Sequence, residues 1–165
     1  MIRANHLCLE QALMLLDALD DAQYANRRGD WSPVGAQLRH VIEHYQSFVS
    51  GLPGRAIDYD ARRRDVTIET SRSRAAAVIR ELMAQLAAAG TVPAATPVQV
   101  KMECDPDEAA PSWATSSVGR ELQFLVSHSV HHFALIKLLV AGEGIALDPE
   151  FGIAPSTVSH ARASR

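Results

Sequence analysis

The sequence predicts an all-α protein, a four-helix bundle, and three observations support this fold class. Apolar residues recur at helical spacing in four long segments. Alanine is abundant, whereas aromatic residues make up only 5% of the chain, and this composition favours helices. Stretches rich in glycine and proline separate the segments. With 165 residues, the chain is expected to form one domain over residues 1–165 with its own core.

The first two helices are predicted over residues 4–25 and 33–50. Leucine and alanine form one apolar face of the first helix, and Gly29 stops the chain from continuing it. Ser32 is predicted to cap the second helix and Pro33 to open it, because proline is tolerated at the first helical position. A stretch with two glycines and a proline ends this helix.

A long connection over residues 51–68 follows the second helix. Neighbouring antiparallel helices need only about two to eight connecting residues. We therefore expect a crossover that runs the length of the bundle. The third helix is predicted over residues 69–89, beginning near Thr67 or Thr70 and stopping at Gly90.

The fourth helix is predicted over residues 115–142, with Ser116 or Ser117 as its cap. The proline-rich segment before it, residues 91–114, contains the alternating stretch VQVKMECD, which is typical of one short strand. The tail after the fourth helix has glycine and proline at turn spacing and no helical period, so we expect it to be irregular.

Charge and hydropathy exclude several classes of protein. The net charge of −3 gives no electrostatic footprint for nucleic acid. No apolar run reaches the roughly 20 residues of a membrane span, and the N-terminus lacks the features of a signal peptide. We expect a cytoplasmic protein in which Cys8 and Cys104 are reduced and form no disulfide.

Two histidine pairs carry the candidate chemistry. His128 and His132 stand four residues apart and share the inward face of the fourth helix, whereas His131 points to one side. His40 and His44 repeat this spacing on the second helix. Three neutral imidazoles from two helices, with water or substrate as the fourth ligand, suit a divalent transition metal such as zinc, nickel or iron. Spacing alone leaves open which histidine of the second helix faces the other pair.

Other residues have alternative interpretations. Glu43 or Glu121 is a candidate to orient a ligating imidazole through a hydrogen bond. The cluster of Arg62, Arg63 and Arg64 is interpreted as local pairing or a solvated turn. The histidines themselves could instead form a polar core in which carboxylates satisfy the imidazoles.

Four stretches together resemble the DinB-like superfamily of small bundles, over roughly residues 5–158. They are SPVGAQLRHVIEHYQSFVSGL, IDYDARRRDVTIET, RELQFLVSHSVHHFALI and FGIAPST. The resemblance implies an up-down-down-up order of helices. It also implies three metal ligands: His128, His132 and, after the QLR of the second helix, His40, with His44 as the fallback ligand.

The resemblance further implies a metal-dependent hydrolase or a low-molecular-weight-thiol S-transferase. Its partners would be a small-molecule substrate or thiol, with a homodimer as the expected assembly. Arg62 or Arg64 is then a candidate contact for an anionic substrate, and FGIAPST is either a lid over the bundle end or a packed tail. The alternative function is a non-catalytic bundle that binds metal or dimerises as a stress-associated protein.

Overall fold

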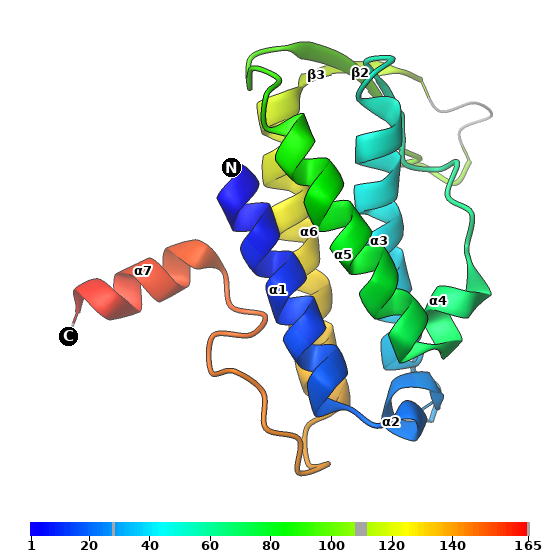
Figure 1. The fold of residues 1–165 in the computed structure, drawn as a ribbon, viewed down its shortest axis with the longest axis vertical. Coiled ribbons are helices and arrows are strands. Elements are labelled where there is room, and N and C mark those ends of the chain that lie inside the picture. Colours follow the sequence, from blue (N-terminus) through cyan, green and yellow to red (C-terminus); the bar gives the residue numbers. More distant parts are fainter. Residues whose placement is uncertain (28, 108–111, 165) are drawn as a thin grey trace.

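The computed structural model of the chain describes residues 1–27, 29–107 and 112–164, and it is mostly helical with one small sheet (Figure 1). The predicted helical class is therefore confirmed. Arg28, residues 108–111 and Arg165 lie outside the described residues. They include part of the predicted break around Gly29 and part of the segment predicted over 91–114.

The four longest helices in the described part of the chain pack on one another (Figure 1). They are α1 (Ile2–Ala18), α3 (Val34–Gly51), α5 (Arg72–Ala89) and α6 (Val118–Leu139). Both α1 and α3 contact α5 and α6, so each helix buries its apolar face against two neighbours. The buried core accordingly draws leucine, isoleucine, valine and aromatic side chains from all four helices.

The predicted first helix is in fact two helices. α1 ends at Ala18, and the short α2 (Asp21–Ala25) begins after Asp20. Asp20 Oδ1 accepts a hydrogen bond from the Gln23 N–H at 2.7 Å, while Gln23 Oε1 accepts one from the Asp20 N–H at 2.9 Å. This reciprocal capping box starts a new helix where the apolar pattern alone predicted a continuous one.

The predicted third helix is also divided. Asp65 caps the short α4 (Val66–Thr70), and Ser71 then caps α5 by accepting a hydrogen bond from the Arg74 N–H. α4 begins one residue before Thr67, and the cap of α5 directly follows Thr70, so the predicted start is close to both; the prediction of one continuous helix is wrong, because two side-chain caps follow closely on one another. The predicted stop at Gly90 is confirmed, since Gly90 is the C-cap of α5.

The caps of the other two long helices give one correction and one confirmation. Pro33 itself occupies the position before α3, with no side-chain cap, so Ser32 does not cap this helix. Ser117 caps α6 and accepts a hydrogen bond from the Arg120 N–H at 3.2 Å, as predicted.

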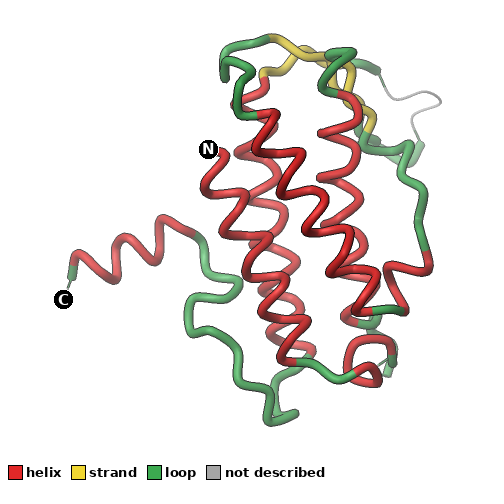
Figure 2. The backbone as a smooth tube through the Cα atoms, in the orientation of Figure 1, coloured by secondary structure: helices red, strands yellow, loops and turns green. Residues whose placement is uncertain are grey.

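A three-stranded sheet closes one end of the helices (Figure 2). The strands β1 (Ala56–Asp58), β2 (Pro97–Lys101) and β3 (Ala114–Ser117) lie in that order; β1 pairs parallel to β2, and β3 pairs antiparallel to it. The sequence predicted one strand, within the stretch that holds β2. β1 and β3 have only three and four residues, too few to show an alternating pattern.

The connection after α3 returns along that helix from β1 to α4, at the opposite end of the molecule (Figure 1). Its last residue before α4 is fixed to α3, because the Asp65 N–H donates a hydrogen bond to Glu43 Oε1 at 2.8 Å. This extended segment, residues 59–65, forms one wall of the site described below.

The prediction of an irregular tail is wrong for its end, because residues Pro155–Ala163 form the helix α7. A helix shows an apolar stripe in its sequence when one of its faces packs on the core. None of the residues of α7 is buried, so its sequence has no such stripe. Within FGIAPST, Phe151 is buried and stacks on Phe133 of α6, with ring centroids 4.9 Å apart. The structure thus shows packing against α6 for Phe151, whereas the last three residues of the stretch are exposed and begin α7.

Cys8 and Cys104 are both free, as predicted. Among the described residues, no helix combines the length and the apolar character that a membrane crossing requires.

Candidate metal centre

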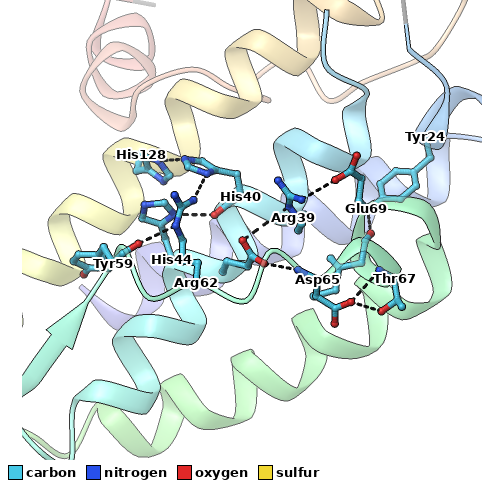
Figure 3. A network of polar contacts seen from close by, with 12 residues as sticks. Tyr24, Arg39, His40, His44, Tyr59, Arg62, Asp65, Thr67, Glu69 and His128 are labelled. Carbon is cyan, nitrogen blue, oxygen red and sulfur yellow. Dashed lines mark hydrogen bonds and ion pairs between the residues drawn. The ribbon is translucent and has the colours of Figure 1, made fainter. Parts of the chain in front are cut away.

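Three of the predicted ligands converge between α3 and α6. One ring nitrogen from each of His40, His128 and His132 lies within 4.8 Å of the others. His40 Nε2 and His128 Nε2 are 3.2 Å apart (Figure 3). The arrangement follows from helical spacing, because residues four apart on α6 face α3 together, and the two helices pack directly.

His44 is a fourth imidazole in the same cluster. Its ring centroid lies 4.0 Å from that of His128 and 4.5 Å from that of His40, and the residue is only 4% exposed. His44 Nδ1 donates a hydrogen bond to the His40 carbonyl oxygen at 2.8 Å, which leaves a lone pair on Nε2. Both histidines of α3 therefore lie beside His128, and the group whose ligand atoms converge contains His40.

Gln37, which the sequence pattern did not single out, orients His132. His132 Nδ1 lies 2.7 Å from Gln37 Oε1, an acceptor, so Nδ1 carries the proton and Nε2 holds the lone pair. Gln37 precedes His40 by three positions and so shares its face of α3. This spacing of three residues is the feature of the sequence that could have identified Gln37 as a partner of the cluster.

The two carboxylates predicted to orient imidazoles contact other groups instead. Glu43 accepts the Asp65 N–H and lies 3.9 Å from the Arg39 guanidinium. Glu121 accepts hydrogen bonds from Tyr59 Oη at 2.9 Å and from Ser116 Oγ at 2.5 Å. In the described part of the chain, a glutamine and a backbone carbonyl do the orienting that was predicted for carboxylates.

Burial keeps the clustered imidazoles neutral. It is the main cause that lowers the pKa of His40 to about 3 and the pKa values of His44 and His132 to about 4. Burial likewise lowers the pKa of His128 far below its ordinary value, and the neighbouring imidazoles add to the effect. A neutral imidazole has a free lone pair, which is the form that binds a metal ion.

The separations of the nitrogens fit a small divalent ion. Bonds of about 2.0–2.1 Å in a tetrahedral site place ligand nitrogens roughly 3.3 Å apart. His40 Nε2 and His128 Nε2 already stand at 3.2 Å, and a ring nitrogen of His132 lies within 4.8 Å of the ligand atoms of both. His128 Nδ1 is buried without a hydrogen-bond partner among the described residues, so the surrounding protein does not satisfy this ring as a polar core would.

Two aromatic rings line the cluster. Phe124 stacks on His128 with centroids 5.5 Å apart, and Tyr59 stacks on His44 with centroids 5.4 Å apart. Since Tyr59 is also tied to the buried Glu121, its ring is held rigidly against His44. An ion in the cluster would therefore have an apolar wall on one side.

The remaining candidates are divided by exposure and contact. His131 is exposed and lies beside His132 rather than in the converging set, as expected. Arg64 is exposed, whereas Arg62 is half-buried and its Nη1 contacts His40 Nδ1 (Figure 3). Arg62 thus lies against the histidine cluster rather than in a solvated turn.

Comparison with known proteins gives the family. FK506-binding protein 5 of Rhizopus delemar is 30% identical to the chain over 104 residues, an alignment that covers 63% of this chain and 27% of that protein. The chain therefore spans about a quarter of the length of this relative. A family model described as the DinB superfamily matches residues 5–136, which include the whole histidine cluster. With this match over most of its length, the chain belongs to the DinB superfamily.

Proposed function

We propose that the chain is a metal-dependent enzyme whose ion is held by His40, His128 and His132. The main support for this proposal is that three neutral imidazole rings from α3 and α6 each place one nitrogen within 4.8 Å of the others. Membership of the DinB superfamily supports this proposal. His44 is the alternative ligand of α3, because its Nε2 has a free lone pair and its ring centroid lies 4.0 Å from that of His128.

The chemistry that a bound zinc, nickel or iron ion supplies is Lewis acidity, which lowers the pKa of a bound water or thiol. The chain's own residues prepare this site. Gln37 fixes the tautomer of His132, and the His40 carbonyl fixes that of His44. Phe124 and Tyr59 exclude water from one side of the cluster, which strengthens electrostatic interactions within it.

The reaction classes that such a site supports are hydrolysis of a small molecule and transfer to a low-molecular-weight thiol. We place the protein in the cytoplasm, as a homodimer, and with its helices in the up-down-down-up order. Figure 1 supports that order, since α1 and α6 run in one direction and α3 and α5 in the other. Arg62 and Arg64 stay candidate contacts for an anionic group on the substrate.

Metal content of the purified protein tests the proposal. We expect about one zinc, nickel or iron ion per chain after purification without chelators, measured by plasma emission spectrometry. The variants His40→Ala, His128→Ala and His132→Ala should each lose the ion. His131→Ala is the matched control, because it removes an exposed neighbouring imidazole and should keep the ion.

His44→Ala separates the two candidate ligands of α3. Retention of metal in this variant and its loss in His40→Ala would support His40, and the reverse result would assign the role to His44. Absence of stoichiometric metal from the unmutated protein, even after titration with each of the three ions, would refute the metal site. A thermal-shift screen of thiols and small electrophiles then tests substrate binding, with a metal-dependent shift as the expected result, and product formation from each compound that binds tests catalysis.

A further inference from the structure

Arg62 contacts the histidine cluster at a ring nitrogen. Its Nη1 lies against His40 Nδ1, while its Nε donates a hydrogen bond to the Tyr59 carbonyl oxygen at 2.8 Å (Figure 3). A guanidinium group has five N–H donors and no acceptor. His40 Nδ1 must therefore accept this hydrogen bond, which places the proton of the neutral ring on Nε2.

This tautomer of His40 is opposite to that of its neighbours. His44 and His132 carry their protons on Nδ1, facing acceptors, and have free lone pairs on Nε2. His40 Nε2 instead carries a proton and faces His128 Nε2 at 3.2 Å, where it donates a hydrogen bond. The nitrogen of His40 that points into the cluster is thus blocked by its own proton.

Metal binding through His40 Nε2 and the Arg62 contact exclude one another. A neutral ring that binds an ion through Nε2 carries its proton on Nδ1. That proton would point directly at an Arg62 N–H, so two donors would meet without an acceptor between them. The positive charge of Arg62 would also lie one ring away from a divalent cation, which disfavours binding further.

We propose that Arg62 is a latch that controls the metal affinity of the cluster. In the closed state, Arg62 contacts His40 Nδ1 and holds the ring in the tautomer that cannot bind a metal ion through Nε2. In the open state, Arg62 has turned away, and His40 Nδ1 is free to carry the proton. This inference rests on the proposed metal site and adds a positioning residue from the segment over residues 59–65, which is far in sequence from His128 and His132.

Glu43 is the candidate partner for an Arg62 guanidinium that turns away from His40. Arg62 lines a pocket of about 800 Å³ between α3 and α5, whose wall also contains Glu43. Glu43 is 1% exposed, and its Oε2 makes no hydrogen bond within the described residues. The Glu43 charge also acts on Arg62, since it opposes the lowering of the Arg62 pKa by burial. Arg39 Nε lies 3.9 Å from Glu43 Oε2, beyond hydrogen-bond distance, so this oxygen can still accept a hydrogen bond from Arg62.

The backbone on both sides of Arg62 is fixed, so the latch moves as a side chain. The Tyr59 N–H donates a hydrogen bond to the Lys101 carbonyl oxygen at 2.9 Å, and the Asp65 N–H donates one to Glu43 Oε1 at 2.8 Å. Rotation of Arg62 about its side-chain bonds therefore suffices, with no rearrangement of α3 or α6.

Zinc affinity of matched variants tests the latch. Zn²⁺ is titrated against a chromophoric chelator into the full chain and into Arg62→Gln, Arg62→Lys and Arg63→Gln. Arg62→Gln removes the charge and offers His40 Nδ1 an acceptor oxygen like that of Gln37, so we expect binding about three- to tenfold tighter than in the unmutated protein. Arg62→Lys keeps a charged donor and should bind much as the unmutated protein does.

Arg63→Gln is the control, because Arg63 lines the same pocket and is exposed. It removes the same charge from the same segment and should leave the affinity within twofold. Zinc binding by Arg62→Gln that is equal to or weaker than that of the unmutated protein would overturn the latch. An equal gain in affinity in Arg63→Gln would also overturn it, because a general effect of charge would then explain both variants. Neither result would affect the proposed metal site, provided that the unmutated protein binds zinc.

Nitrogen-15 NMR of the histidine rings tests the latch without a variant. In the chelator-treated protein at neutral pH, we expect protonated Nε2 for His40 and protonated Nδ1 for His44 and His132. Addition of Zn²⁺ should move the His40 proton to Nδ1. A His40 ring already protonated at Nδ1 before zinc addition would refute the latch, whereas failure of all forms, including Arg62→Gln, to bind zinc would refute the metal site itself.

Discussion

At the scale of single residues, the hydrogen-bond partner of Nδ1 decides whether the Nε2 atom of each imidazole has a lone pair for a metal ion. His132 and His44 face acceptors, and both have their lone pairs on the nitrogen away from that acceptor. His40 faces a donor. Three chemically identical side chains within one cluster therefore differ in readiness to bind an ion, and the difference lies entirely in their hydrogen-bond partners.

Gln37→Leu should weaken zinc binding about tenfold, because it removes the acceptor that fixes the His132 tautomer while keeping the volume of the side chain. Chelator competition measures the change. Gln46→Leu is the control, since this glutamine also lies on α3 but lines the pocket on the α5 side. Equal zinc affinities of the two variants would show that Gln37 does not orient His132.

The sequence predicted the histidines of the cluster but not their partners. His128 and His132 were predictable because helical spacing alone puts them on one face. The partnership of Gln37 with His132 spans 95 positions and depends on how closely α3 approaches α6. The same holds for Tyr59, whose hydrogen bond to Glu121 spans 62 positions. Such contacts follow from packing distances that no local pattern encodes.

At the scale of elements, the start of α3 is set by a very close approach to α4. A Cβ atom added to Gly35 would lie 1.9 Å from the Glu69 carbonyl oxygen and 3.0 Å from Tyr24 Cε1. The same junction is held by a hydrogen bond from Tyr24 Oη to the Ile68 carbonyl oxygen and by the ion pair of Arg39 with Glu69 at 2.8 Å. The two helices are therefore fixed by polar contacts at a distance that only glycine permits.

Gly35→Ala should lower the free energy of unfolding by about 1–3 kcal/mol, because the clash involves a backbone carbonyl that cannot move alone. Alanine's better helix propensity, worth about 1 kcal/mol, offsets only part of this cost. Urea denaturation measures the effect. Gly54→Ala is the control, since its added Cβ would meet nothing closer than 3.8 Å. Equal stability of Gly35→Ala and the unmutated protein would contradict the close approach.

Long elements were predictable from the sequence, whereas their boundaries were not. α1, α3, α5 and α6 each contain at least four turns of apolar periodicity. The breaks before α2 and α5 arise from single caps, Asp20 and Ser71, which override a continuing apolar pattern. α7 was missed because it buries nothing, and β1 because its pairing with β2 joins distant segments.

At the scale of the whole molecule, the buried and partly buried imidazoles of the cluster make stability depend on pH. His40, His44 and His132 have folded pKa values of about 3 to 4, below the ordinary value of 6.5, so the unfolded chain binds more protons between those limits. Stability is therefore fully present above about pH 6.5 and is lost as the pH falls toward 4.

Between pH 6 and pH 4.5, the unfolding free energy of the chelator-treated protein should fall by about 1 kcal/mol per pH unit for each of these three imidazoles. Urea midpoints across this range measure the slope. His44→Phe, which replaces one of these rings with an apolar ring, should reduce the slope by about one such increment. His160→Phe, at an exposed position on α7, should leave it unchanged. A flat profile in the unmutated protein would contradict neutral buried histidines.

Truncation after Ala154 should leave the melting temperature within about 2 °C, because the described residues of α7 bury no side chain. Truncation after Asp148 should lower it by about 5 °C or more, since it also removes Phe151 and its contact with Phe133. Differential scanning calorimetry compares the two proteins. Equal melting temperatures would show that Phe151 does not contribute to the core.

The convergence of His40 with His128 also bears on the order of folding events. These residues are 88 positions apart, so the ligand set is incomplete until α6 has docked on α3. Closing so long a loop carries an entropic cost that only the assembled core offsets. An ion that meets its full coordination only after this docking should leave the refolding rate unchanged and slow the unfolding rate, and stopped-flow measurements with and without zinc would separate the two. Bound metal would then increase the kinetic stability of the folded protein, because it slows unfolding without changing the rate of folding.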